Sequence, residues 1–130
     1  MYHRKERVNR ATFLYCHGNA GNIGHRLENY YQIHSEFDVN ILAVEYRSYG
    51  DSQNAPLSEA SIISDTLACY KYLMNSPMGL NPDKVVIFGR SLGGAVAVAL
   101  CVEVLEACAK HRSGIGSEDD GLYDDCDEDP

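Results

Sequence analysis

One serine of this chain stands in a context in which its hydroxyl group could act as a nucleophile. The run Gly89-Arg90-Ser91-Leu92-Gly93 fits the pattern G-x-S-x-G, and it lies between two apolar stretches. In this pattern the serine occupies a sharp turn from a strand into a helix, which exposes its hydroxyl at the edge of a sheet. Gly89 and Gly93 lack the side chains that would collide in so tight a bend. The spacing therefore predicts a serine nucleophile at position 91.

A serine that attacks an acyl carbonyl also needs main-chain N–H donors for the oxyanion that develops. The N–H group of Leu92 would lie at the N-terminus of the following helix, where it has no partner within the helix. The loop His17-Gly18-Asn19-Ala20-Gly21-Asn22 follows the first apolar stretch, where a second donor is expected. We select the N–H of Asn19 as that donor. Gly18 and His17 are expected to support the loop, with His17 as a hydrogen-bonding brace and not as the base.

The same loop does not fit the common nucleotide-binding patterns. A dinucleotide loop would need glycine at position 20, where the chain has Ala20, and no Gly-Lys-Ser or Gly-Lys-Thr run of a P-loop occurs. The five cysteines form no C-x-x-C pair, and the acidic residues near the C-terminus lack the spacing of a calcium loop. We therefore expect no cofactor and no metal ion.

The elements that must position these residues can be recognised from apolar patterning. Three short stretches, residues 11–16, 39–45 and 84–88, are almost continuously apolar, which is typical of parallel strands covered on both faces. Helical segments separate and follow them. The order β-α-β-α-β-α predicts the α/β class, with a partial, doubly wound, three-stranded parallel sheet and helices on both of its faces.

Each of the first two helices is expected to turn one apolar face toward the sheet. These faces are formed by Leu27, Tyr30, Ile33 and Phe37, and by Ile63, Leu67, Tyr70 and Met74. Ser58 should cap the second helix and Pro77 should stop it. The third helix, Leu92–Ala109, is apolar on nearly every side as far as Val102, which predicts a buried helix.

The charge of the chain is concentrated near its C-terminus. The formal net charge is -8, and the eight acidic residues after Gly116 account for it, since the other acidic residues equal the 11 Lys and Arg residues in number. A neutral body has no basic patch to neutralise phosphates, so nucleic-acid binding is not expected. We expect a folded domain over residues 1–112 and a solvated, disordered acidic tail over residues 113–130.

The cysteine pattern and the hydropathy indicate a cytoplasmic location. An odd number of unpaired cysteines is typical of free thiols in a reducing compartment. Met1–Arg10 is polar and is not followed by the apolar core of a signal peptide. No apolar run is expected to reach the length of a membrane span.

Three segments together resemble the signatures of one enzyme family. They are residues 14–26 (LYCHGNAGNIGHR), 46–52 (YRSYGDS) and 88–97 (FGRSLGGAVA). They are similar to the first signature, the tyrosine-arginine-glycine-tyrosine-glycine loop and the nucleophile turn of the membrane-anchored α/β-hydrolase domain-containing hydrolases. Ser48 departs from this pattern, because the family has glycine there, and we expect a local adjustment of the loop.

The resemblance implies an α/β-hydrolase fold and the hydrolysis of acyl esters or thioesters. Relatives in this branch include enzymes that remove palmitoyl groups from proteins, so the implied substrate is an acylated small molecule, lipid or protein. Membrane contact is implied only through family segments that have no counterpart here, and the oligomeric state is not predicted. The family's sheet places the first strand between the other two, which would leave residues 39–45 and 84–88 as apolar edges.

The acid and the histidine of a catalytic triad are expected to follow the serine along the chain. Only His111 follows Ser91, and it would lie roughly 30 Å away at the far end of the same helix. His25 and His34 are expected to be surface or half-buried residues. We therefore expect the acid and histidine to lie outside this chain, as in an incomplete gene model or splice product, and the chain alone to hydrolyse little. The alternative function is a catalytically inactive fragment or an interaction module.

Overall fold

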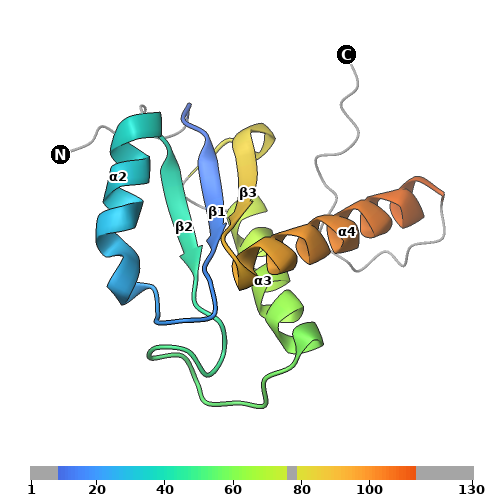
Figure 1. Ribbon diagram of the computed structural model, residues 1–130. Coiled ribbons are helices and arrows are strands. Elements are labelled where there is room, and N and C mark those ends of the chain that lie inside the picture. The colour runs from blue at the N-terminus through green and yellow to red at the C-terminus, as the bar shows by residue number, and fades with distance from the viewer. Residues whose placement is uncertain (1–8, 76–78, 114–130) are drawn as a thin grey trace.

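The structure is a computed structural model that describes residues 9–75 and 79–113 of the chain. Within them lie the strands β1 (Thr12–Cys16), β2 (Asn40–Val44) and β3 (Val85–Gly89), and the helices α2 (Leu27–Phe37), α3 (Glu59–Met74) and α4 (Leu92–Arg112). Two short turns of 3-10 helix, η1 (Gly24–Arg26) and η2 (Pro82–Lys84), precede α2 and β3. The alternation of strands and helices confirms the predicted α/β class (Figure 1). Apart from Ser113, the predicted acidic tail lies outside the described residues.

The three strands form one parallel sheet in which β1 lies between β2 and β3. Cys16, the last residue of β1, stands beside Val44 of β2 and Gly89 of β3, so the strands end level with one another. The segments that follow the three strands therefore begin at one edge of the sheet. That edge carries the serine turn and the loop of His17. As expected, β2 and β3 are the edge strands.

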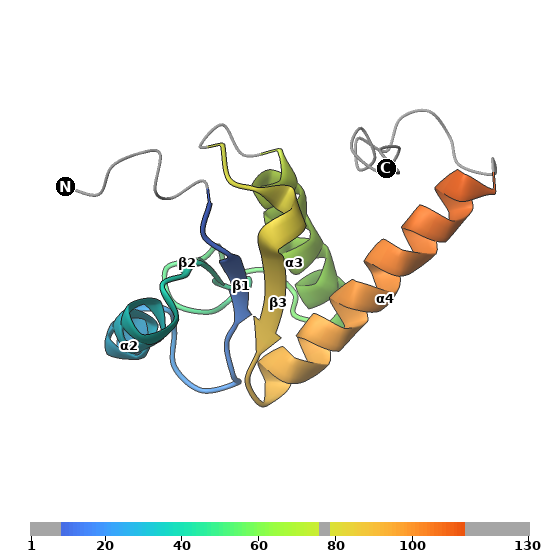
Figure 2. The same ribbon diagram turned by 90° about the horizontal axis from the view of Figure 1, so that it is seen from above.

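The main core lies between the sheet and the helices α3 and α4, which share one face of it (Figure 2). Leu14, Cys16 and Val44 point toward this face from the strands and are buried, and α4 contributes Val96 and Leu100. Alternate residues of a strand point to opposite faces of a sheet. Thus a single run of apolar residues in β1 supplies both this core and the aromatic layer on the other side.

The opposite face of the sheet carries aromatic side chains and the helix α2. The rings of Tyr15 and Tyr30 meet edge to face at 4.9 Å, and those of Phe13 and Phe88 stack at 5.7 Å. However, Phe88 is 37% exposed and its neighbour Val86 is 42% exposed. The expectation that the strands are covered on both faces is therefore wrong for β3. The reason is that α2, the helix on this face in the described chain, lies over β2 and reaches no further than Tyr15.

Helix α2 buries less of its apolar face than its sequence pattern predicts. Tyr30 is buried and Ile33 is half-buried, but Leu27 is 67% exposed and Phe37 is 63% exposed. The pattern is wrong for these two residues because they stand at the two ends of α2. Only the middle of the helix packs on the edge of the sheet. The helix ends at Asp38, whose φ of 53° is left-handed.

Helix α3 begins as predicted, but the face that it buries is next to the predicted one. The hydroxyl of Ser58 accepts the N–H of Ser61, and the hydroxyl of Ser61 accepts the N–H of Ser58. The fully buried side chains are Ile62, Thr66 and Leu73, whereas the predicted face of Ile63, Leu67, Tyr70 and Met74 is half-buried. The buried face is displaced by one residue from the predicted one because it includes Thr66, a polar residue that an apolar pattern does not mark. Its hydroxyl donates to the carbonyl of Ile62 at 2.8 Å and so can be buried. Pro77, the predicted stop, lies outside the described residues.

Helix α4 starts at Leu92 as predicted and ends at Arg112, three residues beyond the predicted end. It is not a buried helix, since Val98 and Leu105 are 66% and 67% exposed and Val102 is 48% exposed. The C-terminal half of α4 projects beyond the sheet (Figure 2). The pattern shows that this surface is apolar, but apolar residues alone do not supply a neighbouring element to cover it.

The described cysteines are free thiols with contrasting surroundings, which predicts a selective chemical reactivity. Burial raises the pKa of Cys16 from 9.0 to about 12, whereas Cys101 is exposed. Because the thiolate is the nucleophile, iodoacetamide at pH 8 should alkylate Cys101 in minutes and leave Cys16 intact in the folded chain. A raised folded-state pKa also means that ionisation of Cys16 favours unfolding as the pH rises from 9 toward 12. Peptide mass mapping of the alkylated cysteines checks both the selectivity at pH 8 and the effect of rising pH. In urea, where the chain is unfolded, the two cysteines should react alike. Equal reactivity without urea would contradict the burial of Cys16.

Candidate active site

The serine of the G-x-S-x-G run occupies a sharp turn between β3 and α4. Its backbone has a φ of 55° and a ψ of −122°, a left-handed conformation that residues other than glycine rarely adopt. The N–H of Arg90 donates to the carbonyl of Cys16 at 3.2 Å, and the N–H of Gly94 donates to the carbonyl of Ser91 at 2.8 Å. The first bond holds the turn against the end of β1, and the second closes the turn at the start of α4. The side chain of Ser91 is exposed.

The two glycines of the run are required by close backbone contacts. A Cβ atom on Gly89 would overlap the carbonyl group of Gly93, and one on Gly93 would overlap the carbonyl of Cys16 and lie 2.6 Å from that of His17. Gly94, the next residue, has room, because its nearest contact would be an ordinary 3.8 Å. The backbone therefore has the close contacts that exclude a side chain at Gly89 and Gly93, as expected from the sequence.

The loop after β1 passes directly beside the serine turn. A Cβ atom on Gly18 would lie 3.3 Å from the carbonyl oxygen of Arg90 and 3.5 Å from the Cβ of Ser91. Asn19 follows Gly18 at this point, and Leu92 follows Ser91 as the first residue of α4. The structure thus brings together Ser91, Leu92, Gly18 and Asn19.

His17 lies beneath this loop and is completely buried. Its Nε2 donates to Oε1 of Glu45 at 2.9 Å, and its Nδ1 lies 2.7 Å from the carbonyl oxygen of Gly18. Its ring packs on Tyr46, with ring centres 4.5 Å apart. Because both ring nitrogens of His17 have polar partners, its side chain is in a position to hold its own loop in place.

Glu45 is a central residue of this region that sequence reasoning did not single out. It directly follows β2, and its side chain is 13% exposed. Besides the bond from His17, its Oε2 accepts the N–H of Ile23 at 3.0 Å. One carboxylate therefore holds both ends of the loop of residues 17–23. The available signal was a carboxylate at the end of an apolar strand, VNILAVE, on the edge where the site lies.

Two tyrosines after β2 complete the contacts to the same loop. The hydroxyl of Tyr46 donates to the carbonyl of His17 at 3.0 Å, and that of Tyr49 donates to the side-chain oxygen of Asn19 at 2.6 Å. Burial raises the pKa of Tyr46 well above its ordinary value, so its hydroxyl is a permanent donor. Side chains of the loop after β2 thereby bind both the main chain and a side chain of the loop after β1.

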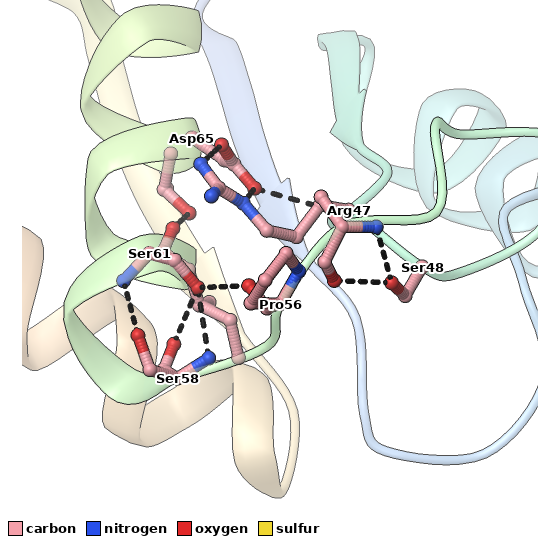
Figure 3. A network of polar contacts seen from close by, with 9 residues as sticks. Arg47, Ser48, Pro56, Ser58, Ser61 and Asp65 are labelled. Atoms are coloured by element: carbon pink, nitrogen blue, oxygen red, sulfur yellow. Dashed lines mark hydrogen bonds and ion pairs between the residues drawn. The ribbon is translucent and has the colours of Figure 1, made fainter.

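The loop after β2 is in turn fastened to α3 by an ion pair (Figure 3). The guanidinium of Arg47 makes two bonds to the carboxylate of Asp65, at 2.8 Å and 2.5 Å, and its main-chain N–H adds a third. Hydrogen bonding to Arg47 holds the pKa of the Asp65 carboxyl below its ordinary value. Ser48 has a φ of 63°, a conformation that glycine adopts more readily than serine, and its hydroxyl donates to the carbonyl of Ala55 at 2.7 Å.

No side chain of the described part of the chain caps the α4 N-terminus or hydrogen-bonds the Ser91 hydroxyl. Nδ1 of His34 lies 2.6 Å from the carbonyl oxygen of Val39, His25 is exposed within η1, and His111 lies in the last turn of α4. Within residues 9–75 and 79–113 there is also no group of three His, Cys, Asp or Glu side chains that could hold a metal ion.

One helix of the described chain, α4, is long and apolar enough to cross a membrane by length and composition. The expectation that no run reaches that length is therefore wrong. The same composition also suits a helix that contributes to a core, as α4 does through Val96 and Leu100.

Comparisons with known proteins identify relatives of this chain by sequence. A family model described as Chlamydia CHLPS protein (DUF818) matches residues 11–112. Protein bem46 of Schizosaccharomyces pombe is 44% identical over 91 residues, which cover 70% of this chain and 30% of that protein. Alpha/beta hydrolase domain-containing protein WAV2 of Arabidopsis thaliana is 39% identical, over 68% of this chain and 28% of its own length. Alpha/beta hydrolase domain-containing protein 17C of Homo sapiens is 31% identical, over 77% of this chain and 30% of its own length.

The chain thus spans about three tenths of the length of these relatives. No solved structure matches it significantly. The motifs in the sequence point to one member, alpha/beta hydrolase domain-containing protein 13, but these relatives support the wider group and not that member.

Proposed function

The chain belongs to the DUF818 family and to the alpha/beta hydrolase domain-containing proteins, and on that premise we propose that it carries the nucleophile half of a serine hydrolase acting on acyl esters or thioesters. The observation that carries this proposal is the left-handed turn that presents Ser91 beside the loop of Gly18 and Asn19. Removal of palmitoyl groups from proteins is the specific reaction that the resemblance suggests.

In the proposed reaction the Ser91 oxygen attacks the acyl carbonyl carbon. The hydroxyl proton passes to a base, the carbonyl oxygen becomes an oxyanion, and the C–O or C–S bond then breaks to release an alcohol or thiol. Water cleaves the resulting acyl-serine in a second attack of the same kind. The N–H groups of Leu92 and Asn19 are the proposed oxyanion donors, and one such donor is typically worth about 2.7–4 kcal/mol in the transition state.

The other predicted residues have supporting roles in this proposal. Gly89 and Gly93 allow the backbone to make the turn, and Gly18 lets the neighbouring loop approach Ser91. His17 keeps that loop in place through Glu45. We assign no base to the described residues, and we therefore expect the chain alone to be a slow hydrolase. The cytoplasmic location and the membrane-associated alternative both stay predictions.

The test must detect a competent serine without requiring a complete triad. An alkyl fluorophosphonate forms a phosphoryl-serine ester as fluoride leaves and a base accepts the hydroxyl proton. Imidazole added to the solution can serve as that base. We expect peptide mass spectrometry to find the adduct on Ser91, in an amount that rises with imidazole, and to find far less on the exposed Ser64 of α3.

Two controls give this experiment its meaning. Ser91→Ala should remove the adduct, and Ser64→Ala should leave it unchanged. Equal labelling of Ser91 and Ser64 would contradict the proposal, because it would mean that the turn confers no reactivity. That result would favour the alternative of an inactive fragment or interaction module.

A further inference from the structure

An apolar cavity opens between the N-terminal ends of α3 and α4, next to the serine turn. Its volume is about 420 Å³, within the range of small-molecule sites in proteins. One wall is formed by α4, through Leu92, Ala95 and Ala99, and the other by α3 and the residue before its cap, through Ile63 and Leu57.

The α4 wall is shaped by small residues. Leu92, Ala95, Val96 and Ala99 recur at steps of three and four, so they share one face of the helix. Two of the four are alanines, which leave room where larger side chains would meet α3. The opposite wall carries Leu57, which is 48% exposed although it is apolar. A groove with these walls gains from an apolar occupant, because burial of apolar surface is favourable.

The cavity reaches the proposed oxyanion donors. Asn19 and Leu92 both line it, and so does Tyr49, which hydrogen-bonds the Asn19 side chain. A carbonyl group held by the N–H groups of Asn19 and Leu92 would therefore lie at the wall of the cavity. A substituent of that carbonyl can extend between the helices.

We propose that this groove binds the alkyl chain of the acyl group, and that Ala95 and Ala99 determine which chain lengths it admits. This inference rests on the proposed function and deepens it. The described lining residues favour an alkyl chain over a charged ligand, because Glu59 is the one charged side chain among them and no basic side chain would hold an anion inside the groove. The carboxyl end of a chain would face the main-chain donors of Asn19 and Leu92.

The experiment measures binding and needs no catalysis. The full chain of 130 residues is titrated with dansylaminoundecanoic acid, whose fluorescence rises in an apolar site, and the probe is displaced by butyric, octanoic, lauric and palmitic acids. We expect displacement to strengthen by about fourfold for each buried methylene from butyric acid upward, until the groove is full.

Four variants locate the bound chain. Ala95→Phe at an exposed position and Ala99→Trp deeper in the groove should each weaken probe binding by about tenfold or more, because they occupy the space of the chain. Ala109→Trp, at an exposed position near the far end of α4, is the matched control and should leave binding unchanged. Leu105→Glu, on the exposed apolar side of α4 that points away from the groove, should also leave it unchanged. Far-UV circular dichroism checks that each variant is folded.

The outcomes separate the two proposals. Ser91→Ala should bind the probe as the parent chain does, so binding without any serine adduct would retain the groove and remove the hydrolase function. Loss of binding in Leu105→Glu but not in folded Ala95→Phe would overturn the groove and place the probe on the exposed side of α4. Equal displacement by butyric and lauric acids would overturn it as well.

Discussion

Replacing Gly93 by alanine is expected to unfold the chain or to lower its free energy of unfolding by more than about 4 kcal/mol. The new methyl group would overlap the backbone carbonyl of Cys16 and approach that of His17 to 2.6 Å. Both carbonyls belong to the end of the central strand β1 and cannot rotate away as a side chain would. Either α4 or β1 must move, and that movement breaks the packing of Leu100 and Leu14. Urea denaturation followed by circular dichroism measures the loss.

The adjacent Gly94→Ala is the matched control, since it adds the same methyl group one residue later. That group would lie 3.8 Å from the carbonyl of Gly89, an ordinary contact between α4 and the end of β3. Alanine is the better helix former by about 0.5–1 kcal/mol, so this variant should be slightly more stable than the parent chain. The two substitutions should thus have opposite signs. A Gly93→Ala variant as stable as Gly94→Ala would show that α4 does not approach β1 so closely.

Replacing Glu45 by leucine is expected to lower the free energy of unfolding by about 1–3 kcal/mol, the usual penalty for leaving a buried donor without its acceptor. The change leaves Nε2 of the fully buried His17 without an acceptor and also frees the N–H of Ile23. The loop of residues 17–23 should then lose its shape, and labelling of Ser91 by the fluorophosphonate should fall together with stability. Thermal unfolding and mass spectrometry give the two measurements.

Asp51→Leu serves as the control for this substitution. Asp51 lies on the same side of the molecule, lines a shallow cavity together with Glu45, and is exposed. Removing an exposed carboxylate without a buried partner should change stability by less than about 0.5 kcal/mol. If Glu45→Leu lowers the free energy of unfolding no more than Asp51→Leu does, then Glu45 does not hold the loop. The supporting role assigned to His17 is then refuted as well.

The elements of the fold were predictable because the pattern of apolar residues along a sequence differs between strands and helices. Every strand was expected within one or two residues of its observed bounds, and Ser58 and Leu92 begin their helices as predicted. The turn at Ser91 was also predictable, since a pair of glycines around a serine between a strand and a helix has a local steric meaning. Local rules thus determine where the candidate nucleophile lies.

The partners of the loops were not predictable in the same way. Glu45 bonds His17 across 28 positions of the chain, and Tyr49 bonds Asn19 across 30. Each pair depends on the order of the strands, which places the ends of β1 and β2 side by side. Neither pair has a repeat or spacing that reveals it in one sequence. The same holds for the bond of Arg47 to Asp65, which ties a loop to a helix.

Burial was the weakest prediction, because it depends on what else surrounds an element. Val98 and Leu105 are as apolar as Val96 and Leu100, yet they are exposed. The sequence of α4 shows that both sides of the helix are apolar. It does not show that only one side packs on the sheet in the described chain.

The central position of β1 also governs when the serine turn can form as the chain folds. β1 pairs with β3 across 73 positions, from Thr12 to Val85, and the N–H of Arg90 finds its acceptor only on Cys16. Closing so long a segment carries a large entropic cost before any contact repays it, and non-local pairing of this kind is slow. A growing polypeptide therefore cannot form this turn until its first strand and its third have met, so the candidate site arises late and is lost as soon as that pairing opens.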